Sequence, residues 1–171
     1  AYSVAAGDFN GDGNIDIVSG AYDENIVYVL LGNGDGTLKA KLGYSTASPY
    51  SVTSTDVDGD GNLDIVSGSA ADRIEVLLGN GDGSLKAKLT FAGGDNVRAV
   101  AVADLNGDGV LDVVAGSEWD DRVNVLLGNG DGTFQARISL AGGDGVRGVT
   151  IADLDRDGFL DLVSVSKSDD R

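Results

Sequence analysis

The chain has 171 residues, the length of one ordinary domain, and its 12 basic and 28 acidic residues give a formal net charge of −16. That charge argues against nucleic acid and anionic membrane surfaces as partners, because both are bound through Lys and Arg. The absence of Cys and His removes disulfides, zinc–thiolate sites and the most common general base. No apolar run approaches the roughly 18 residues of a membrane span, so we expect no membrane insertion.

An acidic segment and a glycine-rich segment alternate along the chain and define a repeat. The acidic segment, "DFNGDGNID" in its first copy, recurs at spacings of 48, 48 and 49 residues and starts at Asp8, Asp56, Asp104 and Asp153. The glycine-rich segment, "LLGNGDGTL" in its first copy, starts at Leu30, Leu77 and Leu126. This period is too long for ankyrin or leucine-rich repeats and suits the four-stranded blade of a β-propeller.

Each repeat predicts three inner strands. The first carries only small residues on one face, which suggests close approach to a neighbour at the hub of a blade array; its copies are 2–8, 50–56, 97–104 and 146–153. The second follows the acidic segment and is continuously apolar, as expected of a strand covered on both faces; its copies are 15–20, 63–68, 111–116 and 160–165. The third leads into "NGDG", a strong hairpin signal; its copies are 26–32, 74–79 and 123–128.

A fourth strand is predicted after the glycine-rich turn, at 38–42, 85–89 and 134–138. In "LKAKL" from Leu38, apolar and basic residues alternate, so that Lys39 and Lys41 would face solvent. Lysines on a solvent-facing strand are a common guard against edge-to-edge aggregation. We therefore interpret this segment as the outer strand of each blade.

Together these elements predict an all-β fold of β-propeller blades with four antiparallel strands, about three and a half repeats of 47–49 residues. We expect one array over residues 1–171, with approximate repeats 1–43, 44–92, 93–141 and an incomplete 142–171. Closed propellers use about four to eight blades. The chain is therefore expected to be a fragment of a larger propeller, or to assemble as a homo-oligomer that closes the ring.

The acidic segments have the composition of a calcium site. Ca²⁺ takes about six to eight oxygen ligands, and the segments offer oxygens at alternate positions, a turn glycine and a late acid. Asn62, Val110 and Phe159 share the seventh position, which favours a backbone carbonyl there. The predicted ligands are Asp8, Asn10, Asp12, Asn14 and Asp16; Asp56, Asp58, Asp60, Asn62 and Asp64; Asp104, Asn106, Asp108, Val110 and Asp112; and Asp153, Asp155, Asp157, Phe159 and Asp161.

Repulsion between the carboxylates of a loop favours a metal site over a turn without metal. Asx-rich turns without metal are the alternative, but three or four uncompensated carboxylates so close together repel one another strongly. We expect about four Ca²⁺ per chain. The ion would either be structural in each blade or keep a ligand position open for a partner.

The acidic loop between the first two strands, with "LLGNGDGTF" closing the repeat, resembles FG-GAP/VCBS repeats, the blades of integrin-α-like propellers, in a bacterial version. The resemblance covers the whole chain. It implies a calcium-stabilised propeller of extracellular or cell-surface proteins, used in adhesion, in carbohydrate binding or as an accessory to enzymes. Arg156 departs from the Gly at matching positions 11, 59 and 107, which affects the turn of the fourth loop and not its ligands.

Three functions are compatible with these features. The first is a non-catalytic binding or adhesion module with a protein or glycan ligand; the second is a lectin; the third is an accessory domain of a secreted polysaccharide-degrading enzyme. No residue outside the acidic loops has the pattern of a catalyst, so the chain itself is not expected to be an enzyme.

A few residues outside the acidic loops are candidates for ligand contact. Tyr22 and Trp119 lie in the hairpins after the second strand, and aromatic side chains on loops can stack on sugars; isolated surface hydrophobics are the alternative. One further position, six residues before each acidic loop, holds residues that would line one end of the array: Tyr2, Tyr50, Arg98 and Arg147.

Overall fold

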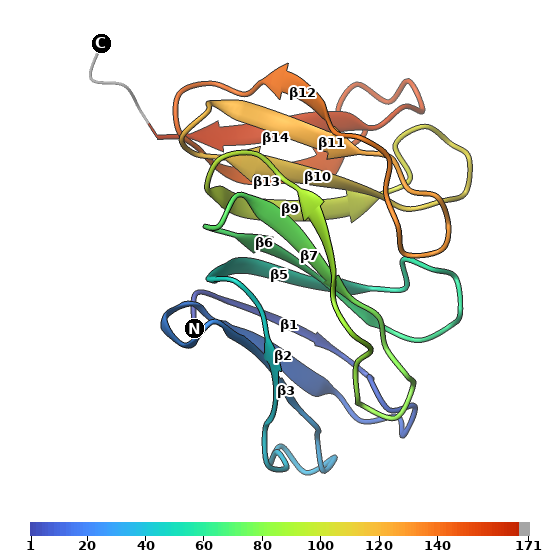
Figure 1. Cartoon of the computed structure of the whole chain (residues 1–171). Coiled ribbons are helices and arrows are strands. Elements are labelled where there is room, and N and C mark those ends of the chain that lie inside the picture. Colours follow the sequence, from blue (N-terminus) through green and yellow to red (C-terminus); the bar gives the residue numbers. More distant parts are fainter. Residues whose placement is uncertain (168–171) are drawn as a thin grey trace.

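The computed structural model describes residues 1–167, so Ser168–Arg171 of the predicted fourth repeat lie outside it. In the described part the fold is all-β apart from one short 3-10 helix, η1 (Tyr22–Glu24), and no helix there is long and apolar enough to cross a membrane. Three four-stranded antiparallel sheets and one two-stranded sheet follow each other along the array, each with its strands in chain order (Figure 1). This confirms the prediction of blade-like units in a partial propeller.

The strand bounds repeat from sheet to sheet. The first sheet comprises β1 (Ser3–Gly7), β2 (Asp16–Ala21), β3 (Ile26–Leu30) and β4 (Leu42–Ser45). The second comprises β5 (Pro49–Thr55), β6 (Asp64–Ser69), β7 (Arg73–Leu77) and β8 (Leu89–Ala92). The third comprises β9 (Val97–Ala103), β10 (Asp112–Ser117), β11 (Arg122–Leu126) and β12 (Ile138–Ala141), and the last comprises β13 (Val146–Ala152) and β14 (Asp161–Ser166).

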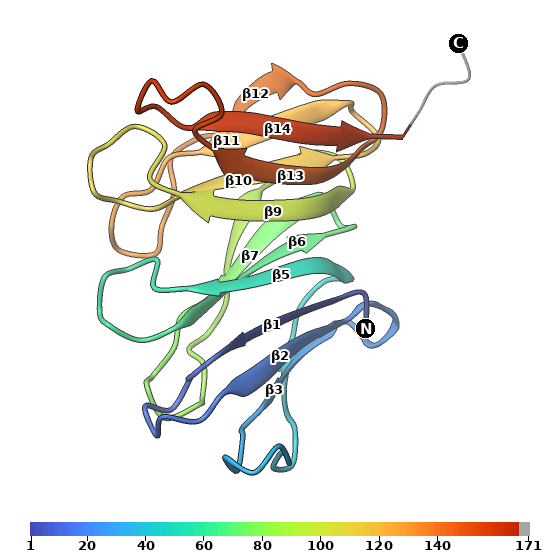
Figure 2. The same cartoon turned by 180° about the vertical axis from the view of Figure 1, so that it is seen from behind.

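The first strands of the four sheets, β1, β5, β9 and β13, lie side by side along one edge of the array (Figure 2). Their small side chains allow this approach, as the sequence predicted. The Ser3 hydroxyl accepts a hydrogen bond from the Val52 N–H at 3.1 Å, and the Ser51 hydroxyl accepts one from the Val100 N–H at 3.3 Å. The first three blades are thus hydrogen-bonded to one another through their inner strands.

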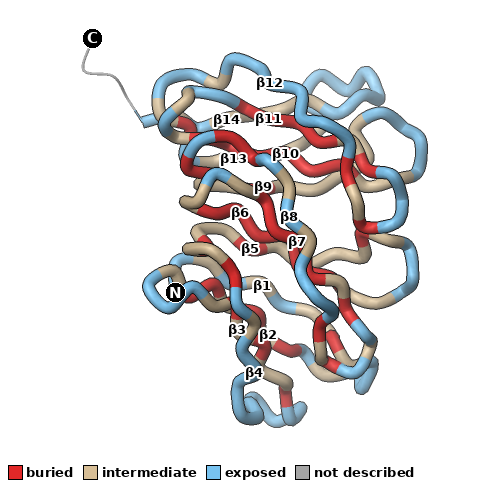
Figure 3. Tube along the Cα trace, in the orientation of Figure 1, coloured by how far each residue is buried: buried red, intermediate tan, exposed pale blue. Residues whose placement is uncertain are grey.

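Apolar faces of successive sheets form the core. Every residue of β6 and of β10 is buried, so both faces of these strands are covered, and exposed residues concentrate in the loops (Figure 3). A glycine late in the second strand permits the sheets to approach. A Cβ on Gly68 would lie 2.8 Å from Val97 Cγ1, and one on Gly116 would lie 2.8 Å from Val146 Cγ1. The "VSG" and "VAG" glycines are therefore packing residues.

The outer strand differs from the prediction. Strands β4, β8 and β12 each begin four residues after the predicted starts at 38, 85 and 134. The reason is the turn. Leu38 pairs with Gly32 in an isolated bridge that closes the "GNGDGT" turn, and pairing resumes only where Leu42 faces Val29. The alternation in "LKAKL" therefore belongs to a crossing segment.

The lysines of that segment contact neighbouring side chains. The Lys88 ammonium lies 2.6 Å from the fully buried Glu75 carboxylate, and Lys41 lies over the Tyr28 ring at 3.6 Å. Lys39 and Lys41 are exposed, as the alternation predicted, but they lie on the crossing segment before β4 and not on a regular strand. The fourth-strand error leaves the number and order of strands in each blade unchanged.

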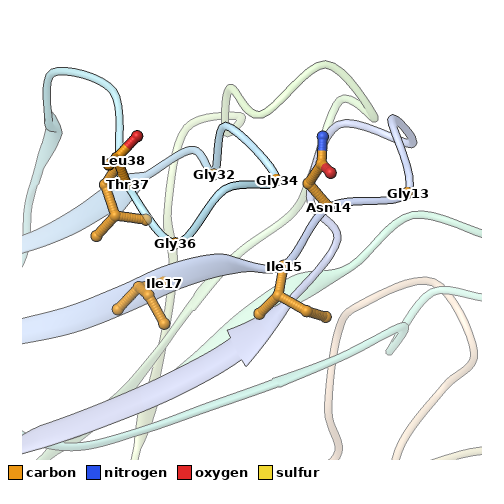
Figure 4. A pocket seen from close by; sticks show the side chains of 9 residues that line it. All are labelled: Gly13, Asn14, Ile15, Ile17, Gly32, Gly34, Gly36, Thr37 and Leu38. Carbon is orange, nitrogen blue, oxygen red and sulfur yellow. The ribbon is translucent and has the colours of Figure 1, made fainter.

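Burial along the array depends on the neighbouring blade. Leu85 and Phe134 are 9% and 8% exposed, because each packs in a cluster shared with the preceding sheet. Leu38, at the same position of the first blade, is 43% exposed. With Ile15 and Ile17 it lines a hollow of about 460 Å³ (Figure 4). The first blade therefore presents the face that the second blade buries.

Leu85 and Leu38 stand in identical "LKAKL" contexts and form a matched pair for testing the packing between blades. Leu85→Ala should lower the free energy of unfolding by about 2–4 kcal/mol, because it leaves a cavity between two sheets. Leu38→Ala should cost less than about 1 kcal/mol, since that side chain is partly exposed. Urea unfolding measures both, and equal losses would contradict this account of the core.

Candidate metal centre

Each acidic loop joins the first strand of a sheet to the second and curls around its first aspartate. In the second loop, the two oxygens of Asp56 accept hydrogen bonds from the Gly59 and Gly61 N–H groups at 2.8 and 2.9 Å. The equivalent bond from the turn glycine recurs in the other loops, from Gly13 to Asp8, Gly109 to Asp104 and Gly158 to Asp153. The first carboxylate thus fixes the turn around it.

The glycines of the loop provide the backbone geometry. Gly59 and Gly61 have φ of +74° and +87°, in the left-handed region that glycine adopts most easily. Arg156 adopts φ +66° at the position of Gly59, and its N–H still donates to Asp153 at 2.7 Å. The substitution at Arg156 therefore leaves the turn of the fourth loop intact.

The closing aspartate joins two segments of its blade. Asp64 is completely buried and accepts one hydrogen bond from the Val57 N–H at 2.8 Å and another from the Gly79 N–H at 2.7 Å. Asp16 and Asp112 are equally buried and make the same pair of bonds, to Phe9 and Gly32 and to Leu105 and Gly128. We call this arrangement the aspartate clasp; it connects the acidic loop to the glycine-rich turn.

The glycine of the clasp admits no side chain. A Cβ on Gly79 would overlap the Leu63 carbonyl oxygen, and Gly32 and Gly128 meet Ile15 and Leu111 in the same way. The sequence of the glycine-rich segment predicts a hairpin and does not reveal that this segment contacts the acidic loop. The signal available was the "LLG" that starts 21 or 22 residues after the first aspartate of each of the first three acidic segments.

Carboxylate side chains converge in the second and fourth loops. One carboxylate oxygen from each of Asp56, Asp58 and Asp64 lies within 4.8 Å of the others, and the same holds for Asp153, Asp155 and Asp161 in the fourth loop. In the first and third loops, Asn10 and Asn106 stand at the second predicted ligand position, where the other two loops have an aspartate. These loops therefore carry one carboxylate fewer. All side-chain donors are oxygens, the ligand type that Ca²⁺ takes.

The aspartate at the third predicted ligand position of each loop accepts a hydrogen bond from the loop backbone, and in two blades it lies near a lysine. Asp60 Oδ1 accepts from the Asn62 N–H at 2.9 Å, and its Oδ2 lies 3.4 Å from the Lys86 ammonium. Asp12 lies 3.9 Å from Lys39 in the same arrangement. Hydrogen bonds from the loop backbone, then the lysine charge, lower the pKa of Asp60.

Burial has the opposite effect on the closing acid. Desolvation raises the pKa of Asp64 to about 6; the bonds from Gly79 and Val57 partly oppose this, and the charges of Asp58 and Asp60 add to it. The buried surroundings therefore disfavour the ionised form of the Asp64 carboxylate. A divalent cation between these carboxylates would reverse the repulsive contribution.

The seventh-position residues direct their side chains to the glycine-rich turn. The Asn14 amide oxygen lies against Gly34, near which Figure 4 places it, and the Asn62 oxygen lies against Gly81 in the same way. Val110 packs beside Gly128, whereas Phe159 is 75% exposed. Their backbone N–H groups donate to the third ligand at 2.8–2.9 Å. Their carbonyls remain predicted ligands.

The candidate aromatics lie at the other end of the sheets. Tyr22, in η1, packs with Tyr2 and Tyr50 at ring-centroid distances of 5.3 and 4.5 Å. Trp119 follows β10 and is 71% exposed. The structure thus separates the two predicted contact residues: Tyr22 belongs to an aromatic cluster, and Trp119 projects from a hairpin.

Gly79→Ala tests whether the aspartate clasp holds the blade without metal. The added methyl group must displace the Leu63 carbonyl, so we expect a loss of about 1–3 kcal/mol in the free energy of unfolding, measured in EDTA. Asn80→Ala is the control, because Asn80 is exposed and its amide donates only to Ser84, at 2.9 Å. Similar losses in both variants would show that the clasp adds nothing.

Known proteins share this architecture. The comparison with curated protein sequences found no match. Among solved structures, a lectin from Agrocybe aegerita that recognises non-reducing terminal N-acetylglucosamine is 25% identical with a TM-score of 0.60, over 93% of this chain and 45% of the lectin. The Vibrio cholerae biofilm matrix protein Bap1 is 26% identical with a TM-score of 0.54, over 94% and 27%. The Photorhabdus luminescens Tc holotoxin pore is 21% identical with a TM-score of 0.54, over 93% and 8%.

The chain therefore spans less than half the length of each of these three structures. The family model of the FG-GAP-like repeat matches residues 8–67, 56–115 and 111–164, each match running from one acidic loop toward the next. These matches cover nearly all the residues that form the sheets and the clasps. The chain belongs to the FG-GAP-like repeat family.

Proposed function

We propose that this chain is a calcium-binding β-propeller module of an extracellular or cell-surface protein, and that it acts by binding a protein or glycan without catalysis. The observation that carries the calcium assignment is the convergence of carboxylates in loops that repeat in register between the same two strands. A single loop of this composition would be weak support. Four copies, two of which bring three carboxylates within 4.8 Å of one another, are strong support.

Calcium fits the donor set and the charge. Ca²⁺ accepts about six to eight oxygens in a flexible geometry, which suits a loop offering carboxylates, Asn side chains and backbone carbonyls. Zinc would prefer the sulfur and nitrogen ligands that this chain lacks. Four bound ions would bring the formal charge from −16 to about −8 and relieve the repulsion around each closing acid.

The role we assign to the ion is structural. The acidic loop connects the first and second strands, and the clasp connects the loop to the turn after the third strand. An ion between the loop carboxylates would hold all three segments together. Extracellular modules bind calcium with Kd of about 10⁻⁴–10⁻³ M, so millimolar calcium outside the cell would keep the sites filled.

Binding without catalysis is supported by the chemistry of the side chains. The chain has no His and no Cys, and its convergent carboxylates belong to the acidic loops. Of the proteins of similar fold, the Agrocybe aegerita lectin recognises N-acetylglucosamine, and the Vibrio cholerae protein belongs to a biofilm matrix. We therefore assign the module to binding or adhesion, with an accessory role beside a polysaccharide-degrading enzyme as a form of the same activity.

A lectin is the second candidate function. It is favoured by the 25% identity to the N-acetylglucosamine-recognising lectin and by the exposed Trp119 ring. On a glycan array, a lectin should give defined spots that Trp119→Ala abolishes while its melting temperature stays unchanged. Spots that survive this change would remove Trp119 from the site.

Calorimetric titration of the metal-free chain should give about four Ca²⁺ per chain, and EDTA should lower the melting temperature. At a tenfold excess over Kd, each site adds about 1.4 kcal/mol to the free energy of unfolding, because calcium binds only the folded loop. A melt that chelation leaves unchanged would refute the calcium assignment.

Asp60→Ala should remove or weaken one site and leave the other three, because blades interact mainly with their neighbours. Asp82→Ala is the matched control: it removes the same charge from an exposed turn of the same blade, where the carboxylate accepts only from Ser84. If both variants bind the same number of ions, Asp60 is not a ligand.

A further inference from the structure

A hollow opens at the end of the hub that lies away from the acidic loops. It has a volume of about 260 Å³ and is lined by Tyr2, Tyr50, Arg98 and Arg147, one residue from the start of each blade. These residues stand at or just before the beginnings of β1, β5, β9 and β13, and the acidic loops follow the ends of the same strands. The hollow and the calcium sites are therefore on opposite faces.

Tyrosine rings form one wall of the hollow. Tyr2 meets Tyr22 and Tyr50 edge-on, at centroid distances of 5.3 and 5.4 Å, and Tyr22 lies against Tyr50 at 4.5 Å with the planes 30° apart. Arg98 lies over the Tyr50 ring at 3.8 Å. Tyr2 is 64% exposed. The wall is therefore an aromatic cluster in which the Tyr2 ring is open to a ligand.

Two guanidinium groups form the other wall, and one carboxylate positions both. Glu118, one residue after β10, accepts from Arg98 Nε at 2.5 Å and from Arg147 Nη2 and Nε at 2.6 and 3.0 Å. Asn96 donates its side-chain amide to the same carboxylate at 3.0 Å. The Glu118 side chain is only 10% exposed, whereas that of Arg147 is 50% exposed. The arginines are thus held in place, and the guanidinium N–H groups that do not donate to Glu118 are the ones available to a ligand.

The charge of the hollow is opposite in sign to the net charge of the chain. Two arginines and one glutamate give it a local excess of one positive charge, on a chain whose net charge is −16. A guanidinium fork matches the two oxygens of a carboxylate and is always protonated. We propose that this hollow binds a terminal sugar residue that carries one carboxylate, such as a uronic acid.

A sugar fits the walls better than other carboxylates. Its carboxylate would meet the arginines, its hydroxyls would meet the tyrosine hydroxyls, and one ring face would lie on Tyr2. A strongly acidic peptide or a polyuronate interior would bring further negative charges toward an acidic surface and be repelled. A single terminal acid avoids this cost. The inference rests on the proposed binding function but uses none of the calcium ligands.

The test compares two ligands that differ only at the charged group. Methyl β-glucuronide and methyl β-glucoside are titrated separately into the ¹⁵N-labelled chain in excess calcium, and amide and arginine Nε shifts are followed. We expect shifts at Tyr2, Arg98 and Arg147 with the glucuronide, and at least about tenfold weaker binding of the glucoside. Equal binding of both sugars, or no binding of either, would overturn the proposal.

Variants locate the site. Arg147→Gln and Tyr2→Ala should each weaken glucuronide binding at least about fivefold, and both side chains are exposed enough for the fold to persist. Arg137→Gln is the matched control, since it removes the same charge from an exposed position before β12. An equal loss with Arg137→Gln would mean that only the overall charge matters, and the proposal would fail.

Two further measurements separate this proposal from its alternatives. A capped Gly-Asp-Gly peptide offers one carboxylate without a sugar ring; if it binds as tightly as the glucuronide, the assignment to a sugar is wrong. Calcium stoichiometry is measured by calorimetry on Arg147→Gln and on the parent chain. In the parent chain, about four bound ions with no glucuronide binding would refute the sugar site alone. Glucuronide binding by a parent chain that binds no calcium in calorimetry would refute the proposed metal centre alone. Arg147→Gln should keep about four ions while it loses glucuronide affinity.

Discussion

The aspartate clasp is the interaction on which each blade depends. A carboxylate that is fully buried, as in Asp16, Asp64 and Asp112, is costly unless its oxygens are satisfied. Here both oxygens accept backbone N–H groups, one from the acidic loop and one from the glycine-rich turn. Two chain segments about 20 residues apart are thereby joined at a point that also belongs to the predicted ion site. Loop, turn and second strand cannot move independently.

Much of this could be predicted from the sequence, because the repeat supplied the same information several times. The four acidic segments fixed the period, and the period with its strand patterns indicated blades. The small faces of the inner strands correctly indicated the hub, where the Ser3 hydroxyl contacts the next blade. The twenty predicted ligands lie on the acidic loops, and their part in holding an ion stays a prediction.

What the sequence did not reveal depends on contacts distant along the chain. Alternation in "LKAKL" is typical of a strand, but Leu38 is held in a bridge to Gly32 and the lysines have partners of their own. Likewise "NGDG" is typical of a two-residue hairpin, and nothing local shows that the glycine before it faces a buried aspartate. Glu118 could not be identified as the partner of Arg98 and Arg147, because it lies in the hairpin after β10, 20 residues or more from either arginine.

The backbone of Phe9 links the first blade to the second. Its N–H is held by Asp16 of the same blade, and its carbonyl accepts the N–H of Gly83, in the turn of the following blade, at 2.9 Å. Leu31, beside the clasp glycine of the first blade, lies under that same turn, and Leu78 lies under the turn at Gly132. In the first two blades, residues beside the clasp thus contact the glycine-rich turn of the following blade. The loop of one blade is therefore coupled to the turn of the next, so that loosening either one would loosen the other.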